Sequence, residues 1–246
     1  MLTVQLADLT DLLKTRPAEP ECFTKAFDLP MRERAIPKQH DLLLPGSEPE
    51  VVHLLLAGHA CRYRMLRDGR RQITAILVPG DLCDLGAILA VRAGYAVGTL
   101  TRCVVGEISL ARSSVRDNPD VAADLNQRLR RDEAIAREWI VSLGRRSAVE
   151  RLAHLFCEIT ARLRAVGRLN GADCELPLTQ TDLADAMGLS TVHVNRTLQE
   201  LKARRVVEMR NRRLVIHDRD TLENLAMFDA GYLQQRPVPD MERLSA

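Results

Sequence analysis

The spacing of apolar residues divides the chain into a β-rich half and a helical half. Between about 40 and 110, apolar residues come in short runs separated by Gly and Pro turn signals, such as "VVHLLLAG" (51–58) and "RQITAILVPGD" (71–81). Several short strands with this punctuation are typical of a compact β-barrel or sandwich. From Pro119 onward the apolar residues recur every three or four positions, which indicates helices. We therefore expect an α+β fold in which the strands come first.

One long helix is predicted over 118–143. Its apolar residues fall at alternating spacings of three and four, with Asp132 as one polar member of the stripe. Such a narrow stripe is a coiled-coil seam, and a helix that carries one usually pairs with its own copy. The alternative is a helix that packs only within its own chain. The predicted dimer interface consists of Ala122, Leu125, Leu129, Ala136, Trp139 and Leu143.

Further helical signals give the domain boundaries. Residues 3–15 show helical spacing, and a capping box of Ser147 and Glu150 starts a new helix after Gly144. The expected domains are an N-terminal helical extension (1–30), a β domain (31–117), the long helix (118–144), a second domain of helices and a hairpin (145–230) and a flexible tail (231–246).

Two short helices with a Gly turn between them are predicted over 179–202. Thr179 and Ser190 suit the N-caps of the two helices, and Gly188 can take the left-handed conformation that ends the first one. The buried stripe of the second helix is Val194, Leu198 and Leu201. This arrangement is a helix-turn-helix.

The outward face of the second helix has short side chains near its N-terminus and hydrogen-bonding side chains further along. In a major groove, Arg grips guanine, Asn or Gln matches adenine, and an apolar group touches a thymine methyl. A hairpin predicted over 205–218, turning at Asn211, adds phosphate-binding charge as a wing. An αα-hairpin that binds a protein is the alternative. The predicted DNA-binding residues are Thr179, Ser190, Thr191, Val192, His193, Asn195, Arg196, Gln199, Lys202, Arg212 and Arg213.

The distribution of charge favours a polyanion as partner. Residues 145–216 hold 13 Lys and Arg against 8 Asp and Glu, whereas the whole chain carries a net charge of only +2. Basic charge gathered in one domain is the electrostatic footprint of nucleic acid binding. The plainer interpretation is a solvated surface.

Other features narrow the class of protein. The six cysteines contain no CxxC, which favours a reducing compartment over a disulfide framework. Because the sequence shows neither a membrane-spanning apolar run nor a signal peptide, we expect a cytoplasmic protein with no membrane partner. Without a Ser/His/Asp, paired-carboxylate or P-loop arrangement, we expect no enzymatic activity.

The order of these features resembles the Crp–Fnr family of bacterial transcription regulators, which includes the cyclic-AMP receptor protein and its oxygen-sensing relatives. The resemblance covers about residues 30–225 and is most specific in "LTQTDLADAMGLSTVHVNRTLQEL", while "DGRRQITAILVPGDL" and "VVGEIS" fit the family's sensor roll. It implies a β-roll sensor domain of the cyclic-nucleotide-binding type and a winged helix-turn-helix. It also implies a homodimer on an inverted-repeat site in double-stranded DNA, with RNA polymerase as a possible further partner.

The recognition helix and the effector pocket both depart from the family's pattern. Many members place a Glu where this chain has Val192, while the Arg that follows is retained as Arg196, so the DNA site should be related but not identical. Members that bind cyclic nucleotides carry a Gly-Glu pair and then an Arg-Ser pair. Here those regions read "LCDLGAIL" and "RAGYAV", so the ribose and the phosphate would lose charged partners. Cyclic AMP is therefore not an expected cofactor. The residues that could line an effector pocket are Cys83, Asp84 and Arg92.

The cysteine spacing supports neither haem nor an iron–sulfur cluster. The oxygen-sensing branch uses a run of closely spaced cysteines before the roll, where this chain has only Cys22. Cys83 with His59, Cys61 or Cys103 could still form a haem, metal or thiol-redox site. A regulatory module that docks on a protein is the other alternative. We predict no cofactor and no metal.

Overall fold

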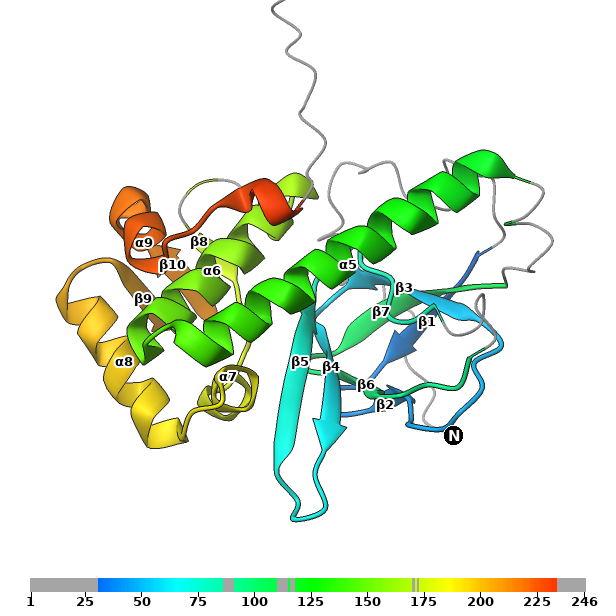
Figure 1. Cartoon of the computed structure of the whole chain (residues 1–246), viewed down its shortest axis with the longest axis horizontal. Coiled ribbons are helices and arrows are strands. Elements are labelled where there is room, and N and C mark those ends of the chain that lie inside the picture. The colour runs from blue at the N-terminus through cyan, green and yellow to red at the C-terminus, as the bar shows by residue number, and fades with distance from the viewer. Residues whose placement is uncertain are drawn as a thin grey trace, which may run out of the picture.

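The computed structural model describes residues 31–85, 91–109, 115, 118–169, 171 and 173–233. It has the predicted α+β fold, in which a β-rich part precedes a helical part. Figure 1 shows the two parts side by side, with the long helix α5 (Pro119–Arg145) running along both of them. The helix predicted at 3–15 and almost all of the predicted tail lie outside the described residues.

The β-rich part contains two antiparallel sheets, with strand orders β1-β7-β3 and β2-β6-β4-β5. The strands are β1 (Met31–Ile36), β2 (Asp41–Leu43), β3 (Val52–Ala57), β4 (Ala60–Met65), β5 (Arg71–Leu77), β6 (Ala96–Thr99) and β7 (Cys103–Ile108). The apolar runs predicted five of these strands. They did not predict β1, because three of its six residues are charged and exposed, or the four-residue strand β6.

Helix α5 begins where Asn118 caps it and Pro119 occupies its first turn. The Asn118 side chain accepts hydrogen bonds from the backbone N–H groups of Asp120 and Val121 at 3.1 and 3.2 Å. Proline suits this position because the first backbone N–H groups of a helix have no partner within it. The helix is therefore fixed by local sequence, and it ends at Arg145, close to the predicted boundary.

The face of α5 that packs against its own chain includes two residues of the predicted dimer interface. Leu125 and Trp139 are each 5% exposed and lie in hydrophobic clusters of the single chain. The Trp139 indole also donates to the Glu158 carboxylate at 3.0 Å. Both side chains serve the chain's own core because α5 lies against other elements on that side. The other four predicted interface residues keep exposed surface: Ala122, Leu129, Ala136 and Leu143.

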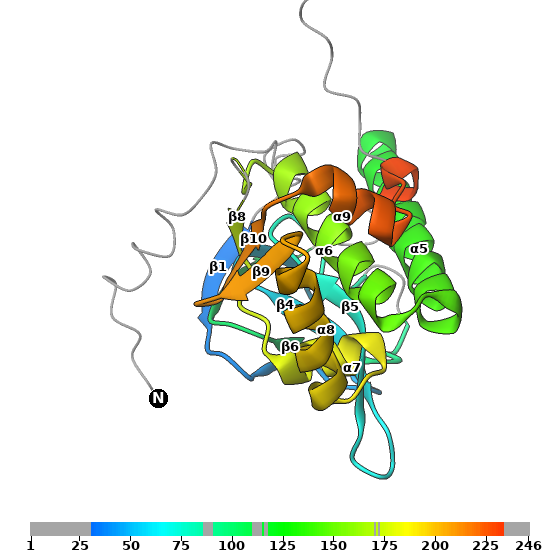
Figure 2. The ribbon, with the colours of Figure 1, turned by 90° about the vertical axis from the view of Figure 1, so that its left-hand side faces the viewer.

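The helical part starts with α6 (Ala148–Ala165), which the predicted capping box of Ser147 and Glu150 begins. The elements that follow are β8 (Asp173–Glu175), α7 (Gln180–Met187), α8 (Thr191–Ala203), β9 (Val207–Arg210), β10 (Arg213–Ile216), α9 (Arg219–Ala226) and the 3₁₀-helix η1 (Ala230–Leu233). Strand β8 pairs with β10, and Cys174 at its centre is buried opposite Leu214. Figure 2 shows α7 and α8 together with the β9–β10 hairpin on the face of the molecule turned toward the viewer.

The two parts share a hydrophobic core and are joined by ion pairs. One cluster of buried residues extends from Cys61, Ile73 and Ile76 in the β4–β5 hairpin into helices α5 to α9. Arg71 at the start of β5 contacts the carboxylates of Asp182 and Asp185 on α7, each at 2.7 Å. Shared apolar contacts and a doubly paired arginine hold the helix-turn-helix against the β4–β5 hairpin. No helix in the described ranges is both long and apolar enough to cross a bilayer.

Candidate DNA interface and effector pocket

Helices α7 and α8 are fixed by three local signals. Thr179 caps α7 in a capping box with Asp182, and Gly188 ends it at φ +63°, in the left-handed region. Ser190 then caps α8 by accepting a hydrogen bond from the His193 N–H at 3.2 Å. The helix-turn-helix thus has the predicted caps and the predicted turn.

Helix α8 has a buried face and an exposed face, with Leu198 of the predicted buried stripe only half-buried between them. Val194 and Leu201 are fully buried, and Thr197 is buried with its hydroxyl donating to the His193 carbonyl at 2.9 Å. Val192 is 79% exposed although it is apolar. The other exposed residues of the predicted reading face are Thr191, Asn195, Arg196 and Gln199, while His193 is half-buried. An apolar side chain left in solvent among hydrogen-bonding neighbours is suited to base edges and thymine methyl groups.

The β9–β10 hairpin has a two-residue turn formed by Asn211 and Arg212. Both residues have positive φ, +49° and +62°, which is the signature of a type I′ turn. This turn matches the right-handed twist of the two strands, so the hairpin is compact. It carries Arg210, Arg212 and Arg213 at its turn, and Arg210 and Arg212 line a groove whose other side is formed by α8.

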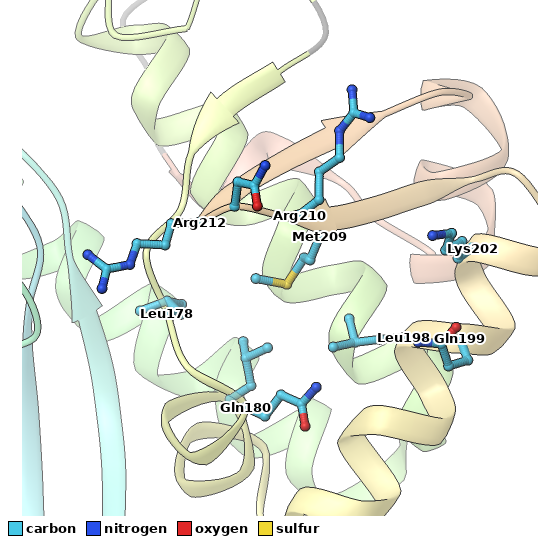
Figure 3. Close-up of a pocket in the computed structure, with 10 residues that line it drawn as sticks. Leu178, Gln180, Leu198, Gln199, Lys202, Met209, Arg210 and Arg212 are labelled. Carbon is cyan, nitrogen blue, oxygen red and sulfur yellow. The ribbon is translucent and has the colours of Figure 1, made fainter.

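A groove of about 240 Å³ lies between α8, the first turn of α7 and the wing. In Figure 3, the Met209 side chain points into the space between Leu178 and Leu198. The polar residues around the groove are Gln180, Gln199, Lys202, Arg210, Asn211 and Arg212. The groove therefore has an apolar floor and polar, basic margins. Gln180 was missed from the sequence because its position beside the wing depends on tertiary packing.

The cations near the groove differ in their availability to DNA. In the part of the chain that the structure describes, Arg196, Arg210 and Arg212 form no ion pair. Lys202 pairs with Glu208 at 2.7 Å, and Arg213 pairs with Asp173 at 2.9 Å. Of the two predicted phosphate contacts in the wing, Arg212 is available in the free protein. Arg213 would have to break its ion pair with Asp173 before it could bind a phosphate.

The structure brings together only two of the three predicted effector-pocket residues. Cys83 and Asp84 are buried, and Asp84 accepts a hydrogen bond from the Tyr95 hydroxyl at 2.8 Å. Arg92 instead lies at the surface, where its guanidinium pairs with Glu48 at 2.8 Å. Its side chain is 73% exposed, so it does not line the same pocket.

The described cysteines are buried and hard to ionise. Burial raises the pKa of the Cys61 thiol to about 12 and that of Cys103 to about 11, and it raises the pKa of Cys83 further. The Cys103 thiol donates to the His59 carbonyl at 3.3 Å. Nowhere in the described ranges do three or more His, Cys, Asp or Glu side chains gather as metal ligands would. Cys22 lies outside those ranges.

Comparison with protein families gives two matches in the order of the fold. The cyclic nucleotide-binding domain matches residues 33–113, and the Crp-like helix-turn-helix domain matches residues 150–225. These two ranges contain the β-rich part and the winged helix-turn-helix described above.

Individual relatives point the same way. The chain is 35% identical to the nitrogen fixation regulation protein FixK of Bradyrhizobium diazoefficiens over 60% of its own length, and the match spans 62% of that protein, just under two thirds. It is 32% identical to the transcriptional activatory protein AadR of Rhodopseudomonas palustris, over 65% of this chain and 68% of AadR. The structure of FixK2 from Bradyrhizobium japonicum superimposes with a TM-score of 0.71 at 26% identity, covering 82% of this chain and 100% of that one. The helix-turn-helix, the matching domains and these relatives agree: the chain belongs to the Crp–Fnr family of transcription regulators, which are DNA-binding proteins and not enzymes.

Proposed function

We propose that the chain acts as a homodimer that binds a specific inverted repeat in DNA without needing cyclic AMP. The observation that carries this proposal is the solvent-facing side of α8, where Val192, Asn195 and Arg196 project beside a groove with basic margins. Such a surface offers both base-reading groups and phosphate-binding cations.

The residues of this surface have separate roles in the proposal. Arg196 reads a guanine, Asn195 or Gln199 reads an adenine, and Val192 touches a thymine methyl. The phosphate backbone is held by Arg212 at the wing, and by Ser190 and Thr191 at the N-terminus of α8. Gln180 and Arg210, which line the groove, add polar contacts to the same backbone.

The dimer is proposed to form along the outward side of α5. Four predicted interface residues belong to an exposed stripe that continues through Ile140, which is 70% exposed. This stripe keeps the alternating spacing of four and three but passes beside Leu125 and Trp139. Its members are Ala122, Asn126, Leu129, Glu133, Ala136, Ile140 and Leu143. Large apolar residues that a single chain leaves in solvent at heptad spacing favour a second copy as the partner.

The proposed organisation is a sensor domain over 31–117, the dimer helix over 118–144 and the DNA-binding domain over 145–230. Two copies of α8 related by a two-fold axis would meet half-sites about one helical turn of DNA apart. We propose RNA polymerase as a further partner of the DNA-bound dimer, and the cytoplasm as the compartment in which the three meet.

Independence from cyclic AMP rests on the effector pocket. Arg92 is paired with Glu48 at the surface, and Asp84 is already bonded to Tyr95. Neither is left in place to hold a cyclic phosphate or a ribose hydroxyl by a charge-assisted hydrogen bond.

The experiment is selection of bound duplexes from a random DNA pool, with and without cyclic AMP, followed by affinity measurement on the enriched sequence. We expect an inverted repeat with half-site centres about 10 base pairs apart, enriched equally in both conditions. Enrichment of no sequence would contradict the DNA-binding role. Enrichment only with cyclic AMP would contradict the independence from that ligand.

A further inference from the structure

Arg62 on β4 points into the interior of the sensor domain. Its Nη2 donates to the Leu82 carbonyl at 2.8 Å and to the Asp132 carboxylate at 2.9 Å. Its Nε donates to the Cys83 carbonyl at 3.1 Å. One guanidinium therefore joins three parts of the fold, namely strand β4, the loop after Gly80 and the middle of α5. The sequence did not suggest this role, since Arg62 and Asp132 are 70 positions apart.

The loop after Gly80 is also tied to α5 by neighbouring residues of that helix. Arg128 donates to the Gly80 carbonyl at 3.0 Å, and Arg131 pairs with Asp81 at 2.9 Å. Asp132 on the same helix accepts the hydrogen bond from Arg62 and so contacts the loop indirectly. Three residues within two turns of α5 therefore hold this loop. The position of α5 on the sensor domain is therefore set by contacts that the chain makes with itself.

The space around Arg62 is largely filled. The guanidinium lies over the Tyr95 ring, 5.7 Å from its centroid, and the Tyr95 hydroxyl is bonded to Asp84. Among the described residues, a cavity between Arg62, Tyr95, Asp132 and Arg162 has a volume of about 140 Å³. Pockets that bury drug-sized ligands have volumes of roughly 300–1,000 Å³. An organic effector of that size would have to displace some of these described groups to enter this cavity.

Arg62 is costly to remove from this position. Its side chain is 16% exposed, and the Asp132 carboxylate that it pairs with is 27% exposed. Loss of the guanidinium would leave a shielded carboxylate and two carbonyl groups without this donor, and such groups are strongly destabilising when they are unpaired. The contact is therefore a permanent part of the folded sensor domain.

We propose that Arg62 is an internal occupant of the effector pocket, linking the loop after Gly80 to α5 as a bound ligand otherwise would, and so holding the protein ready to bind DNA. Asp132 lies on α5 directly before Glu133 of the proposed dimer stripe, so the link controls how that stripe is presented to a second copy. The inference rests on the DNA-binding function proposed above and adds what maintains it: the chain's own arginine in place of a small molecule.

The test compares DNA affinity of wild-type protein with that of Arg62→Ala, using the duplex selected for the wild type and no added ligand. We expect the affinity to fall about 5- to 150-fold, the usual range of coupling between two sites. Ethylguanidinium at millimolar concentration should restore a large part of it, whereas ethylammonium should not, because only the former reproduces the planar donor. Arg64→Ala, an exposed arginine on the same strand, is the matched control and should bind normally.

Asp132→Asn provides a second variant that keeps the volume of the side chain and removes the charge. If Arg62→Ala fails to fold, a smaller loss of affinity is expected in a folded Asp132→Asn variant, because the charge is removed while the carbonyl contacts of Arg62 remain. Wild-type protein that binds no selected duplex would overturn the proposed function together with this inference. Folded Arg62→Ala or Asp132→Asn that binds like wild type, or a folded but weak Arg62→Ala that ethylguanidinium does not restore, would overturn the inference alone.

Discussion

The buried arginines between the two parts of the fold and the exposed arginines of the proposed DNA-binding surface are held in opposite ways. Arg62 and Arg162 lie inside the fold with carboxylate partners, and Arg162 contacts both Asp81 and Glu158. Arg196 and Arg212 lie in solvent and form no ion pair with the described residues. An unpaired guanidinium is strongly destabilising in the interior, whereas an exposed one can remain unpaired and bind a phosphate or a base. The two sets of arginines therefore differ in whether the guanidinium is free to bind a ligand, and not only in how many arginines each contains.

The largest effect is expected from breaking the buried side of this comparison with Arg162→Leu. The change leaves Asp81 and Glu158, which are 4% and 0% exposed, without their main cation. Removing one member of a buried ion pair typically lowers the free energy of unfolding by about 3–5 kcal/mol. Urea unfolding followed by the fluorescence of Trp139, the only tryptophan, measures it. Arg219→Leu, which breaks the surface pair with Glu223, is the control and should lose about 0.3–0.5 kcal/mol. Equal losses would contradict the comparison.

The next effect concerns the exposed apolar stripe on α5. Ile140→Asp should leave the single chain folded, because this side chain is 70% exposed in it, but should place two charges in the proposed dimer interface. We expect the dissociation constant of the dimer to rise about 100-fold or more, which corresponds to about 2.7 kcal/mol. Analytical ultracentrifugation measures the change. Ala123→Asp, at an exposed position beside the stripe, serves as the control. A wild-type monomer, or an Ile140→Asp variant with wild-type dimer affinity, would show that α5 is not the interface.

Within the exposed arginines, Arg196→Ala and Arg212→Ala should fail differently. Loss of a guanine contact typically costs about 1–3 kcal/mol and relaxes the preference at one base pair of each half-site. Loss of a phosphate contact weakens all sequences alike and lowers the salt slope by about one unit. The measurement is binding to the selected site and its single-base variants at several salt concentrations. Arg213→Ala should change the slope less, because Arg213 is paired with Asp173 in the free protein. Full base discrimination by Arg196→Ala would show that the reading face is assigned incorrectly.

A smaller effect is expected from a buried group that stays neutral. His154 is 2% exposed, and burial, followed by the nearby Arg146, lowers its pKa from 6.5 to about 4. The unfolded chain takes up the proton first as the pH falls, so stability is lost between about pH 6.5 and 4 and is fully present above that window. Lowering the pH from 7.5 to 5.5 should therefore reduce the free energy of unfolding by about 1 kcal/mol through His154. His154→Phe should reduce the difference between urea unfolding at pH 7.5 and 5.5 by this amount. An unchanged difference would mean that His154 already protonates in the folded state.

The smallest effect is expected from a thiol reagent. The buried thiols with raised pKa values, Cys83 and Cys103 among them, hold almost no thiolate at neutral pH. A Cys22→Ser variant should therefore react with an aromatic disulfide reagent only at the rate of unfolding, and its affinity for DNA should not change. Fast labelling of Cys83 in the folded protein would revive the thiol-sensor hypothesis.

Sequence analysis predicted most accurately the features that depend on interactions between residues close together in the chain. Thr179, Gly188 and Ser190 act through hydrogen bonds and backbone conformations at their own position, so the helix-turn-helix was predicted with its caps. The side of α5 that we propose for a partner could not be predicted in this way. Stripes through Leu125 and through Asn126 both satisfy alternating spacings of three and four, and only packing of Leu125 and Trp139 against the chain's own core decides between them.

The effector pocket shows the same limit more clearly. Cys83 and Asp84 are neighbours in sequence and stay together in the fold. Arg92 was grouped with them by analogy of position, but it pairs with Glu48, 44 residues away. Arg62, which does reach the loop after Gly80, gave no signal in the sequence, because an arginine alternating along a strand is ordinary for a half-exposed sheet.

The turn of the wing carries a consequence for how this protein could evolve. Asn211 followed by glycine would suit its type I′ conformation best, yet the second position is Arg212 at φ +62°. A left-handed conformation costs a residue with a side chain about 1–2 kcal/mol, a strain that glycine escapes. At this position, the stability of the hairpin and the proposed affinity for DNA therefore favour different residues. Selection for thermal stability alone would favour glycine at position 212. Such a protein would have a more stable hairpin but would lose the guanidinium that we propose for a phosphate contact.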